Sequence, residues 1–484
     1  MTQTPLWTIR DICEAVSAQS DGHGDISGIS FNSKDVRPGH LFVALKGHVT
    51  DGHAYVKEAF IKGAKAALVS EDIVGLKNSD PRLLFVEDTL KALWVLASAS
   101  RLRMKGQVVA ITGSAGKTTT KEALHRSLSR GLKSHANKKS FNNHVGVPLS
   151  LARMPADSEV AVFELGMNGP NEIGPLSKLV KPDIAIITSI GLAHRAGFEQ
   201  DEEIALAKAE IFEGMTKEGI VILPDEITHK YILNIAALNA NLSKVITVPA
   251  KVGEGLDVDI TRLVAHSNCS CLTANVFGEK ITFKVGIPGE HALQNALLIL
   301  AAVKVLGGDL ALAGITLGEM LPLKGRGRSH PLNYDEKAFT LIDDSYNANV
   351  LSMAASIKTL SLMEPLKSGR RIAVLGEMNE LGEVSQAQHL ALGQKVEDAG
   401  VDILIGVGLK MEGLVKNCPG GYQKEWFESR AGITKFLLHN LRNGDVILVK
   451  GATYLGLEEI VNSLIDLDES ENIWEGESLS QAAE

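Results

Sequence analysis

The sequence predicts a three-domain α/β protein whose sheets are mostly parallel. With 484 residues the chain is too long for one hydrophobic core, so several domains are expected. Its 46 glycines and its aromatic content of only 5% are typical of α/β folds with many turns between strands and helices. Short apolar runs alternate with helix-forming stretches, and this alternation favours parallel sheets, whose ligand loops follow the carboxyl ends of the strands.

Composition and charge narrow the expected partners and compartment. The net charge is −9 and no basic run could follow a nucleic-acid backbone, so we expect no nucleic-acid partner. The cysteines Cys13, Cys269, Cys271 and Cys418 show neither zinc-site nor disulfide spacing, which fits a reducing cytoplasm. No apolar stretch approaches the ~20 residues of a membrane span, and a secretory signal is lacking. We therefore expect a cytoplasmic protein without a membrane span, and a monomer.

The first predicted domain, residues 1–97, is small and mixed α/β. The stretch 40–47 is expected to contain a strand that ends at a glycine. Residues 54–70 follow after a polar turn and predict a helix, a glycine turn and a second strand.

The central domain is predicted over residues 98–322. Three apolar runs are expected to form neighbouring strands of one parallel sheet, namely Val108–Thr112, 159–166 and 181–191. A long helix over 289–308 closes the domain.

The third predicted domain, residues 323–465, repeats the pattern of an apolar strand followed by a polar or glycine-rich loop. The repeats lie at 339–349, 370–383, 402–408 and 445–452. They predict a second, Rossmann-like sheet. Residues 466–484 are acidic and serine-rich, and predict a disordered tail.

A shortened phosphate loop follows the first central strand. The usual pattern G-x-x-x-x-G-K-[ST] would place a glycine at position 111, but that residue is Ile111 and the first glycine is Gly113. Gly113 and Gly116 let backbone N–H groups point at an anion beside a helix N-terminus. Lys117 could reach the β- and γ-phosphates and Thr118 a magnesium ion. The alternative is a glycine turn with a surface lysine, but the strand before the loop and the helix after it favour nucleotide binding.

Three further residues are candidates for a functional role at or near the same edge of the sheet. Glu164 ends an apolar strand and suits magnesium, although a helix cap or a surface acid is the alternative. His194 follows the next strand, where a lone histidine is more often structural. Lys208 shares an apolar helical face with Ile204 and Ile211, so it either snorkels to solvent or is recruited for chemistry.

The order of motifs in this chain resembles that of the Mur ligases. The similar motifs include TGSAGKTTTK, FELGMNGPNEIG, GEHALQNALLILAA, IDDSYNANVLSM and AVLGEMNELGE, and the resemblance covers about residues 25–460. The branch it resembles most adds D-alanyl-D-alanine to UDP-N-acetylmuramoyl-tripeptide, and its first domain binds the UDP-sugar. A phosphate loop shortened by two residues is this family's own variant.

The resemblance implies a role for each matching residue. It places the triphosphate on Gly113, Ser114, Ala115, Gly116, Lys117, Thr118 and Thr119. It assigns magnesium to Thr118, Glu164, His194 and Lys208, a lysine that is carbamylated in sister enzymes, and it makes Lys117, His194 and Lys208 the catalytic group. Asn295 would lie near the adenine, and Arg326, with Arg328 as its rival, near the nucleotide.

The third domain and the substrate site complete the implied assignment. Asp344, Tyr346 and Asn347 would meet the nucleotide from the third domain. The sequence VKGATYLGLEE lacks the Ser-Arg that often follows Lys-Gly in the family, which leaves the contact near Lys450 open. Ser33 and Lys34 stand where the family usually has Asp-Ser-Arg. The candidate substrate contacts are Ser33, Lys34, Lys46, Asp51, Asn142 and Asn143.

The implied activity is ATP-dependent amide formation through an acyl phosphate, with ATP and Mg²⁺ as cofactors. Its product is the UDP-linked pentapeptide precursor of peptidoglycan, and the third peptide residue stays open between diaminopimelate and lysine. The near alternatives are a Mur ligase that adds the third amino acid and a folylpolyglutamate synthase. A phosphate-loop kinase or nucleotide switch is the alternative from another class.

Overall fold

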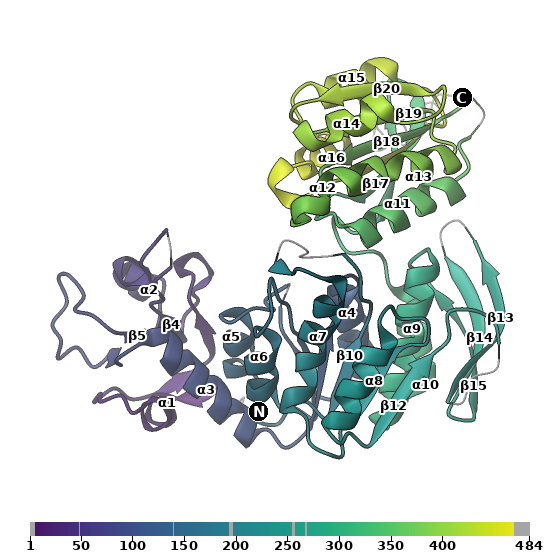
Figure 1. The fold of residues 1–484 in the computed structure, drawn as a ribbon. Coiled ribbons are helices and arrows are strands. Elements are labelled where there is room, and N and C mark those ends of the chain that lie inside the picture. The colour runs from purple at the N-terminus through teal and green to yellow at the C-terminus, as the bar shows by residue number, and fades with distance from the viewer. Residues whose placement is uncertain are drawn as a thin grey trace, which may run out of the picture.

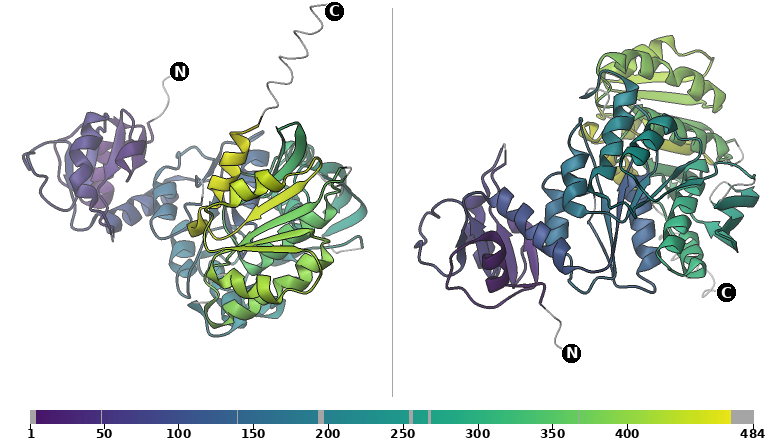
Figure 2. Two further views of the ribbon diagram at one scale, coloured as in Figure 1. Left: turned by 90° about the horizontal axis from the view of Figure 1, so that it is seen from above. Right: turned by 60° about the horizontal axis from the view of Figure 1, so that its bottom comes forward.

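The structure is a computed structural model that describes residues 5–468, apart from 48, 139, 193–196, 254–256, 267–268 and 367. Three bodies follow one another along the chain, and in every view the first extends to one side of the second, away from the third (Figures 1 and 2). The α/β class with parallel sheets is confirmed. The predicted tail lies outside the described residues from 469 onward.

The first body is a four-stranded parallel sheet in the order β3-β4-β5-β6, beside a short β1–β2 pair. Its elements are β1 (Trp7–Thr8), α1 (Ile9–Val16), β2 (Asp25–Ile26), β3 (Gly28–Ser30), β4 (His40–Val43), α2 (Val56–Ile61), β5 (Ala66–Val69) and β6 (Leu83–Phe85). Helix α3 (Thr89–Arg103) leads into the central body and packs on α5 (Gly146–Ala152). The predicted boundary at 97 falls within α3.

The central body holds a six-stranded parallel sheet in the order β12-β11-β10-β7-β9-β8. Its strands are β7 (Gln107–Thr112), β8 (Ser134–Ala136), β9 (Val160–Glu164), β10 (Ile184–Ile187), β11 (Ile220–Pro224) and β12 (Lys244–Val248). Its helices are α4 (Lys117–Leu128), α5, α6 (Ile173–Val180), α7 (Asp201–Ala209), α8 (Lys230–Asn239), α9 (Glu290–Val305) and α10 (Leu310–Glu319). The parallel register brings the loops after β7, β9 and β10 to one edge.

A separate antiparallel sheet, β13-β14-β15, lies against the central body and was not expected from the sequence. Its strands are β13 (Val258–Ala265), β14 (Ser270–Val276) and β15 (Glu279–Val285). Alternate side chains such as Leu272 and Ala274 are buried in the core that includes α9 and α10. The sheet covers the apolar surface of these helices. Its presence depends on this packing, and no local motif in the segment predicts it.

The third body is a six-stranded sheet in the order β16-β17-β21-β18-β19-β20, in which only β16 runs antiparallel to its neighbour. Its strands are β16 (Arg328–Tyr334), β17 (Lys337–Asp344), β18 (Arg371–Gly376), β19 (Ile403–Val407), β20 (Gln423–Phe427) and β21 (Val446–Lys450). Helices α11 (Val350–Leu362), α12 (Ser385–Leu390), α13 (Leu392–Asp398), α14 (Leu409–Asn417), α15 (Ile433–Asn440) and α16 (Glu458–Ile465) cover it. Among the described residues, no helix has the length and apolarity needed to cross a bilayer.

A buried ion pair in the third body yields a stability prediction. Asp445 is fully buried and accepts hydrogen bonds from the Arg370 guanidinium at 2.8 Å and from the backbone N–H groups of Arg370 and Arg442. Asp445→Ala leaves these donors without their acceptor, and we expect it to lower the free energy of unfolding by about 3–5 kcal/mol in urea denaturation. Glu459→Ala breaks the exposed pair with Arg430 and should cost at most about 1 kcal/mol. Equal losses in the two variants would contradict the prediction.

Candidate active site

The phosphate loop connects β7 to α4 and needs its two glycines for steric reasons. Gly113 and Gly116 have φ angles of +152° and +82°. A Cβ at Gly113 would lie 2.0 Å from Oγ1 of Thr188, and one at Gly116 would lie 2.9 Å from Nδ2 of Asn295. The first N–H groups of α4 have no acceptors within the helix and carry its positive dipole end. This turn therefore presents donors to an anion.

Lys117 is the first residue of α4 and folds back over the loop. Its Nζ donates to the carbonyl of Gly113 at 2.6 Å. Burial lowers the pKa of Lys117, and the charge of Arg326 lowers it further, whereas Glu164 and Glu380 act in the opposite direction. A polyanion bound at the loop would stabilise the ammonium form.

Glu164, at the end of β9, has the features of a metal ligand. Its side chain is 1% exposed, and Oε1 accepts a hydrogen bond from Nδ2 of Asn142 at 2.7 Å. Oε2 is buried and has no hydrogen-bond partner among the described residues. A buried carboxylate oxygen without a partner is costly, and a cation would satisfy it. The residues present therefore fit a magnesium ion held by Glu164 and Thr118.

Lys208 lies on α7 with its side chain 1% exposed. Its neighbours on the helical face, Ile204 and Ile211, are fully buried as well. No hydrogen bond or ion pair of the Lys208 side chain is found within the described part of the chain. Burial, and then the charge of Lys117, hold the pKa of Lys208 well below its ordinary value. The lysine is thus not an ordinary surface residue; His194, predicted beside it, lies outside the described residues.

The loop after β17 reaches the phosphate loop from the third body. One cavity of about 660 Å³ is lined by residues of both bodies. The predicted residues that it brings together are Ser114, Ala115, Gly116, Lys117, Thr118, Thr119, Asn142, Glu164, Asn295, Arg326, Asp344, Tyr346 and Asn347.

Several direct contacts join the two bodies at this cavity. The hydroxyls of Ser140 and Tyr346 lie 2.8 Å apart, and Nδ2 of Asn349 donates to the carbonyl of Ser114 at 3.1 Å. The Arg326 guanidinium lies 4.3 Å from the ring centre of Tyr346 and donates to Oγ1 of Thr118 at 3.2 Å. Arg328 is exposed at the start of β16, so the geometry favours Arg326 over its rival.

The structure shows which groups Lys450 contacts, a question that the sequence left open. Its buried Nζ donates to Oδ2 of Asp344 at 2.8 Å and to the carbonyl of Asn347 at 3.0 Å. Thr453, which stands in the departure from the family pattern, donates through its hydroxyl to the carbonyl of Tyr346 at 2.5 Å. The end of β21 therefore holds the cavity-lining loop in place. The only signal for this in the sequence was the Lys-Gly pair after an apolar strand.

The candidate substrate residues are divided between the first and the central body. Ser33 is buried and Lys34 exposed in the first body, where Lys46 pairs with Glu71. Asn143 accepts hydrogen bonds from the backbone N–H groups of Val145 and Gly146, so it shapes the turn before α5. None of these side chains lines the cavity described above.

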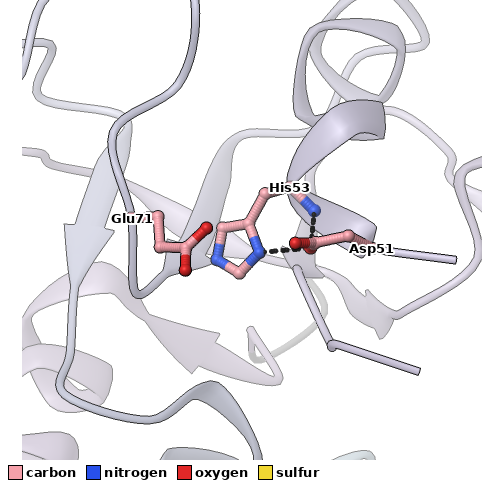
Figure 3. A group of neighbouring side chains, drawn as sticks. All are labelled: Asp51, His53 and Glu71. Atoms are coloured by element: carbon pink, nitrogen blue, oxygen red, sulfur yellow. Dashed lines mark hydrogen bonds and ion pairs between the residues drawn. The ribbon is translucent and has the colours of Figure 1, made fainter. Parts of the chain in front are cut away.

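Asp51 lies close to His53 and Glu71, and of these two it is hydrogen-bonded to His53 (Figure 3). Nδ1 of His53 lies 2.6 Å from Oδ1 of Asp51, and Nε2 accepts from the backbone N–H of Ser70 at 3.0 Å. Both ring nitrogens are thus used within the protein. The group fixes the turn around Asp51 against β5, and it offers a cation no histidine nitrogen.

The fold and this cavity define a three-domain α/β protein with a phosphate loop at the edge of its central sheet, facing the third domain. Comparison with protein families matches the Mur ligase catalytic domain to residues 25–103, the middle domain to 111–303 and the glutamate ligase domain to 327–453. The chain belongs to the Mur ligase family.

Individual relatives match almost the whole chain. The UDP-N-acetylmuramoyl-tripeptide--D-alanyl-D-alanine ligase of Rickettsia prowazekii is 30% identical over 473 residues, which are 94% of this chain and 99% of the relative. The enzyme of that name from Bacillus subtilis is 31% identical over 91% of this chain and 93% of its own. A crystal structure of MurF from Acinetobacter baumannii superposes with a TM-score of 0.81 at 28% identity, covering 95% and 99% of the two chains. MurF of Thermotoga maritima, in complex with ADP, gives 0.75 at 26% identity over 92% and 98%.

The two neighbouring arginines provide a matched test of the cavity. Arg326→Ala removes a guanidinium beside Thr118, and we expect it to weaken binding of a non-hydrolysable ATP analogue by about 10-fold to 100-fold, the range for a hydrogen bond to a charged group. Arg328→Ala should leave the affinity within about 2-fold, because its side chain is exposed on β16. Isothermal titration calorimetry would decide, and the reverse order of effects would reassign the nucleotide contact to Arg328.

Proposed function

We propose that this chain is an ATP-dependent ligase that joins D-alanyl-D-alanine to UDP-N-acetylmuramoyl-tripeptide in peptidoglycan synthesis. The observation that carries this function is a cavity lined by the phosphate loop, Glu164 and the loop after β17. One carboxylate oxygen of Glu164 has no hydrogen-bond partner in the part of the chain that the structure describes. The substrates follow from relatives of that name, which match this chain over more than nine tenths of its length.

The site residues suit a reaction that gathers negative charge. The peptide carboxylate attacks the γ-phosphorus of ATP, the bond to the β,γ-bridging oxygen breaks, and an acyl phosphate and ADP form. The amine of the dipeptide then attacks the carbonyl carbon, loses a proton, and phosphate departs as the amide forms. Lys117 and the N-terminus of α4 offset the phosphate charge, and Arg326 adds a cation from the linker to the third body.

Magnesium would be held by Thr118 and Glu164, joined by His194 and Lys208 as the resemblance implies. When bound, the ion neutralises charge on the phosphate oxygens. The chain's own residues orient that site, since Asn142 fixes one oxygen of Glu164, while the other has no hydrogen-bond partner among the described residues.

The contacts between the two bodies serve to exclude water. An acyl phosphate hydrolyses if water reaches it, and a closed cavity prevents this. Tyr346, Asn349 and Arg326 already bridge the bodies across the cavity. We further propose that the enzyme acts in the cytoplasm, where nucleotide substrates are made, and as a monomer, because both walls of the cavity come from one chain.

Lys117→Ala tests the ATP assignment. We expect the variant to fold normally but to lose ligation, because the only lysine at the start of α4 is removed from the phosphates. Mass spectrometry of the product with the full set of substrates measures ligation, and thermal melting measures folding. ATP should raise the melting midpoint of the natural protein and not that of the variant.

Two outcomes would contradict this assignment. Ligation at the natural rate in Lys117→Ala would remove ATP from the phosphate loop. Phosphate release by the natural protein that needs neither the UDP-tripeptide nor the dipeptide would favour a nucleotide switch or a kinase over a ligase.

Lys208→Ala tests whether this lysine works as a carbamate. A buried neutral amine reacts with carbon dioxide to give an anion, which could bind magnesium beside Glu164. We expect Lys208→Ala to lose most ligase activity and to regain part of it when acetate or formate fills the vacated space. Lys117→Ala is the control and should show no rescue. Full activity without added carboxylate would make Lys208 structural, and loss without rescue would mean that it acts as a cation.

A further inference from the structure

Lys121 is a buried cation that the reaction described above leaves without a role. It lies on α4, one helical turn after Lys117, and its side chain is 0% exposed. Its Nζ donates to the carbonyl of Asn137 at 2.5 Å and pairs with Oε1 of Glu122 at 2.7 Å. Removing an ammonium group from water is costly unless its partners offset the loss of hydration. An apolar side chain would fill the same space without that cost, so the charge at this position calls for an explanation.

The acceptor of Lys121, Asn137, directly follows β8 and is 1% exposed. The parallel pairing of β8 with β9 ends at the partners Ala136 and Val162. Beyond that point the Asn137 side chain takes over the contact with β9. Its Oδ1 accepts from the backbone N–H of Glu164 at 3.0 Å, and its Nδ2 lies 3.3 Å from the carbonyl of Glu164. A side-chain amide thus holds the last residue of β9 at both of its backbone polar groups.

The loop that follows β8 also holds the carboxylate of Glu164. Nδ2 of Asn137 donates to the carbonyl of Phe141 at 2.8 Å, which ties the loop to Asn137. Asn142, the next residue, donates to Oε1 of Glu164 at 2.7 Å. Main chain and side chain of Glu164 are therefore fixed from one segment, and Oε2 alone remains without a partner among the described residues.

We propose that Lys121 and Asn137 are positioning residues for the metal-binding carboxylate of Glu164. The Lys121 ammonium holds the main chain of Asn137, and the Asn137 amide holds the main chain of Glu164. The phosphate-loop helix and the main chain of Glu164 are thereby joined through Asn137. This connection holds the metal-binding carboxylate at a fixed position relative to the phosphate loop. This inference rests on the proposed function, which places a magnesium ion between the nucleotide and Glu164.

The chain of contacts predicts a specific defect when it is broken. Groups that orient a metal ligand typically change metal affinity by about 10-fold to 100-fold when they are removed. Lys121→Met and Asn137→Ala should therefore raise, by at least about 10-fold, the Mg²⁺ concentration at which binding of the ATP analogue AMP-PNP is half-maximally strengthened. Affinity for AMP-PNP in EDTA should stay within about 2-fold, because the donors of the phosphate loop are intact. Calorimetric titrations at a series of Mg²⁺ concentrations measure both quantities.

The controls separate positioning from general stabilisation. Lys304→Met removes a lysine of the same domain that pairs with Glu279 at the surface of α9, and neither quantity should change. Glu164→Gln should itself shift the Mg²⁺ dependence, and adding Lys121→Met to it should produce little further shift, because both act through one carboxylate. If Lys121→Met does not fold, Asn137→Ala carries the test, since it keeps the lysine and its backbone acceptor.

Distinct results would overturn the inference or the function beneath it. Equal weakening with and without Mg²⁺, or additive effects in the double variant, would make Lys121 and Asn137 merely structural. An unchanged Mg²⁺ dependence in both single variants would refute the inference while leaving the proposed function intact. A natural protein whose binding of AMP-PNP does not respond to Mg²⁺ would instead refute the metal site on which the inference rests.

Discussion

The arrangement of this site depends on one constraint, which is that several anions must bind at one edge of a sheet. The site must accept a triphosphate and a peptide carboxylate together, and like charges at close range repel strongly when water is excluded. The junction of β7 with α4 meets this need by supplying N–H donors, a helix dipole and Lys117 within a few residues of each other. Because parallel strands end at a common edge, Glu164 at the end of β9 reaches the same point.

The third domain depends on the same junction. Its loop after β17 lines the cavity and is held from β21 and the residues that follow it. Lys450 binds Asp344 and the carbonyl of Asn347, and Thr453 donates to the carbonyl of Tyr346. The departure from the family's Ser-Arg thus has a physical account, since the threonine hydroxyl makes a backbone contact at this loop. Arg326 then joins the two domains through Thr118 and Tyr346. Lys117 and Arg326 thus bring two cationic side chains to the same cavity.

The parts of the site that lie close together in sequence could be predicted from it. The glycines, lysine and threonines of the phosphate loop lie within seven residues of sequence, and Glu164 directly follows an apolar run, so both features predict a place at the edge of the sheet. The structure brings these residues to one cavity, and their roles there stay a prediction. The hydrogen bonds that link Lys121 to Asn137 and Asn137 to Glu164 could not be predicted, because they require α4, β8 and β9 to lie side by side. Asn142 was assigned to substrate, and the structure places its amide on Glu164, a pairing of residues far apart in sequence. The antiparallel sheet β13-β15 was missed for the same reason, because only the helices it covers require it.

Two lysines of the central body, Lys117 and Lys208, show how burial acts on an amine. Burial lowers the pKa of both Lys117 and Lys208, and the charge of Lys117 adds to the effect on Lys208. Two nearby ammonium groups repel each other, and the repulsion is smaller if one of them is neutral. A polyanion bound at the phosphate loop would favour the protonated form of Lys117. Lys208 differs from Lys117, because it has no acidic partner within the described residues. The nearby charge of Lys117 lowers the pKa of Lys208 further. Burial therefore acts against the charged form of both amines, whereas Glu164 and Glu380 oppose this effect at Lys117 alone.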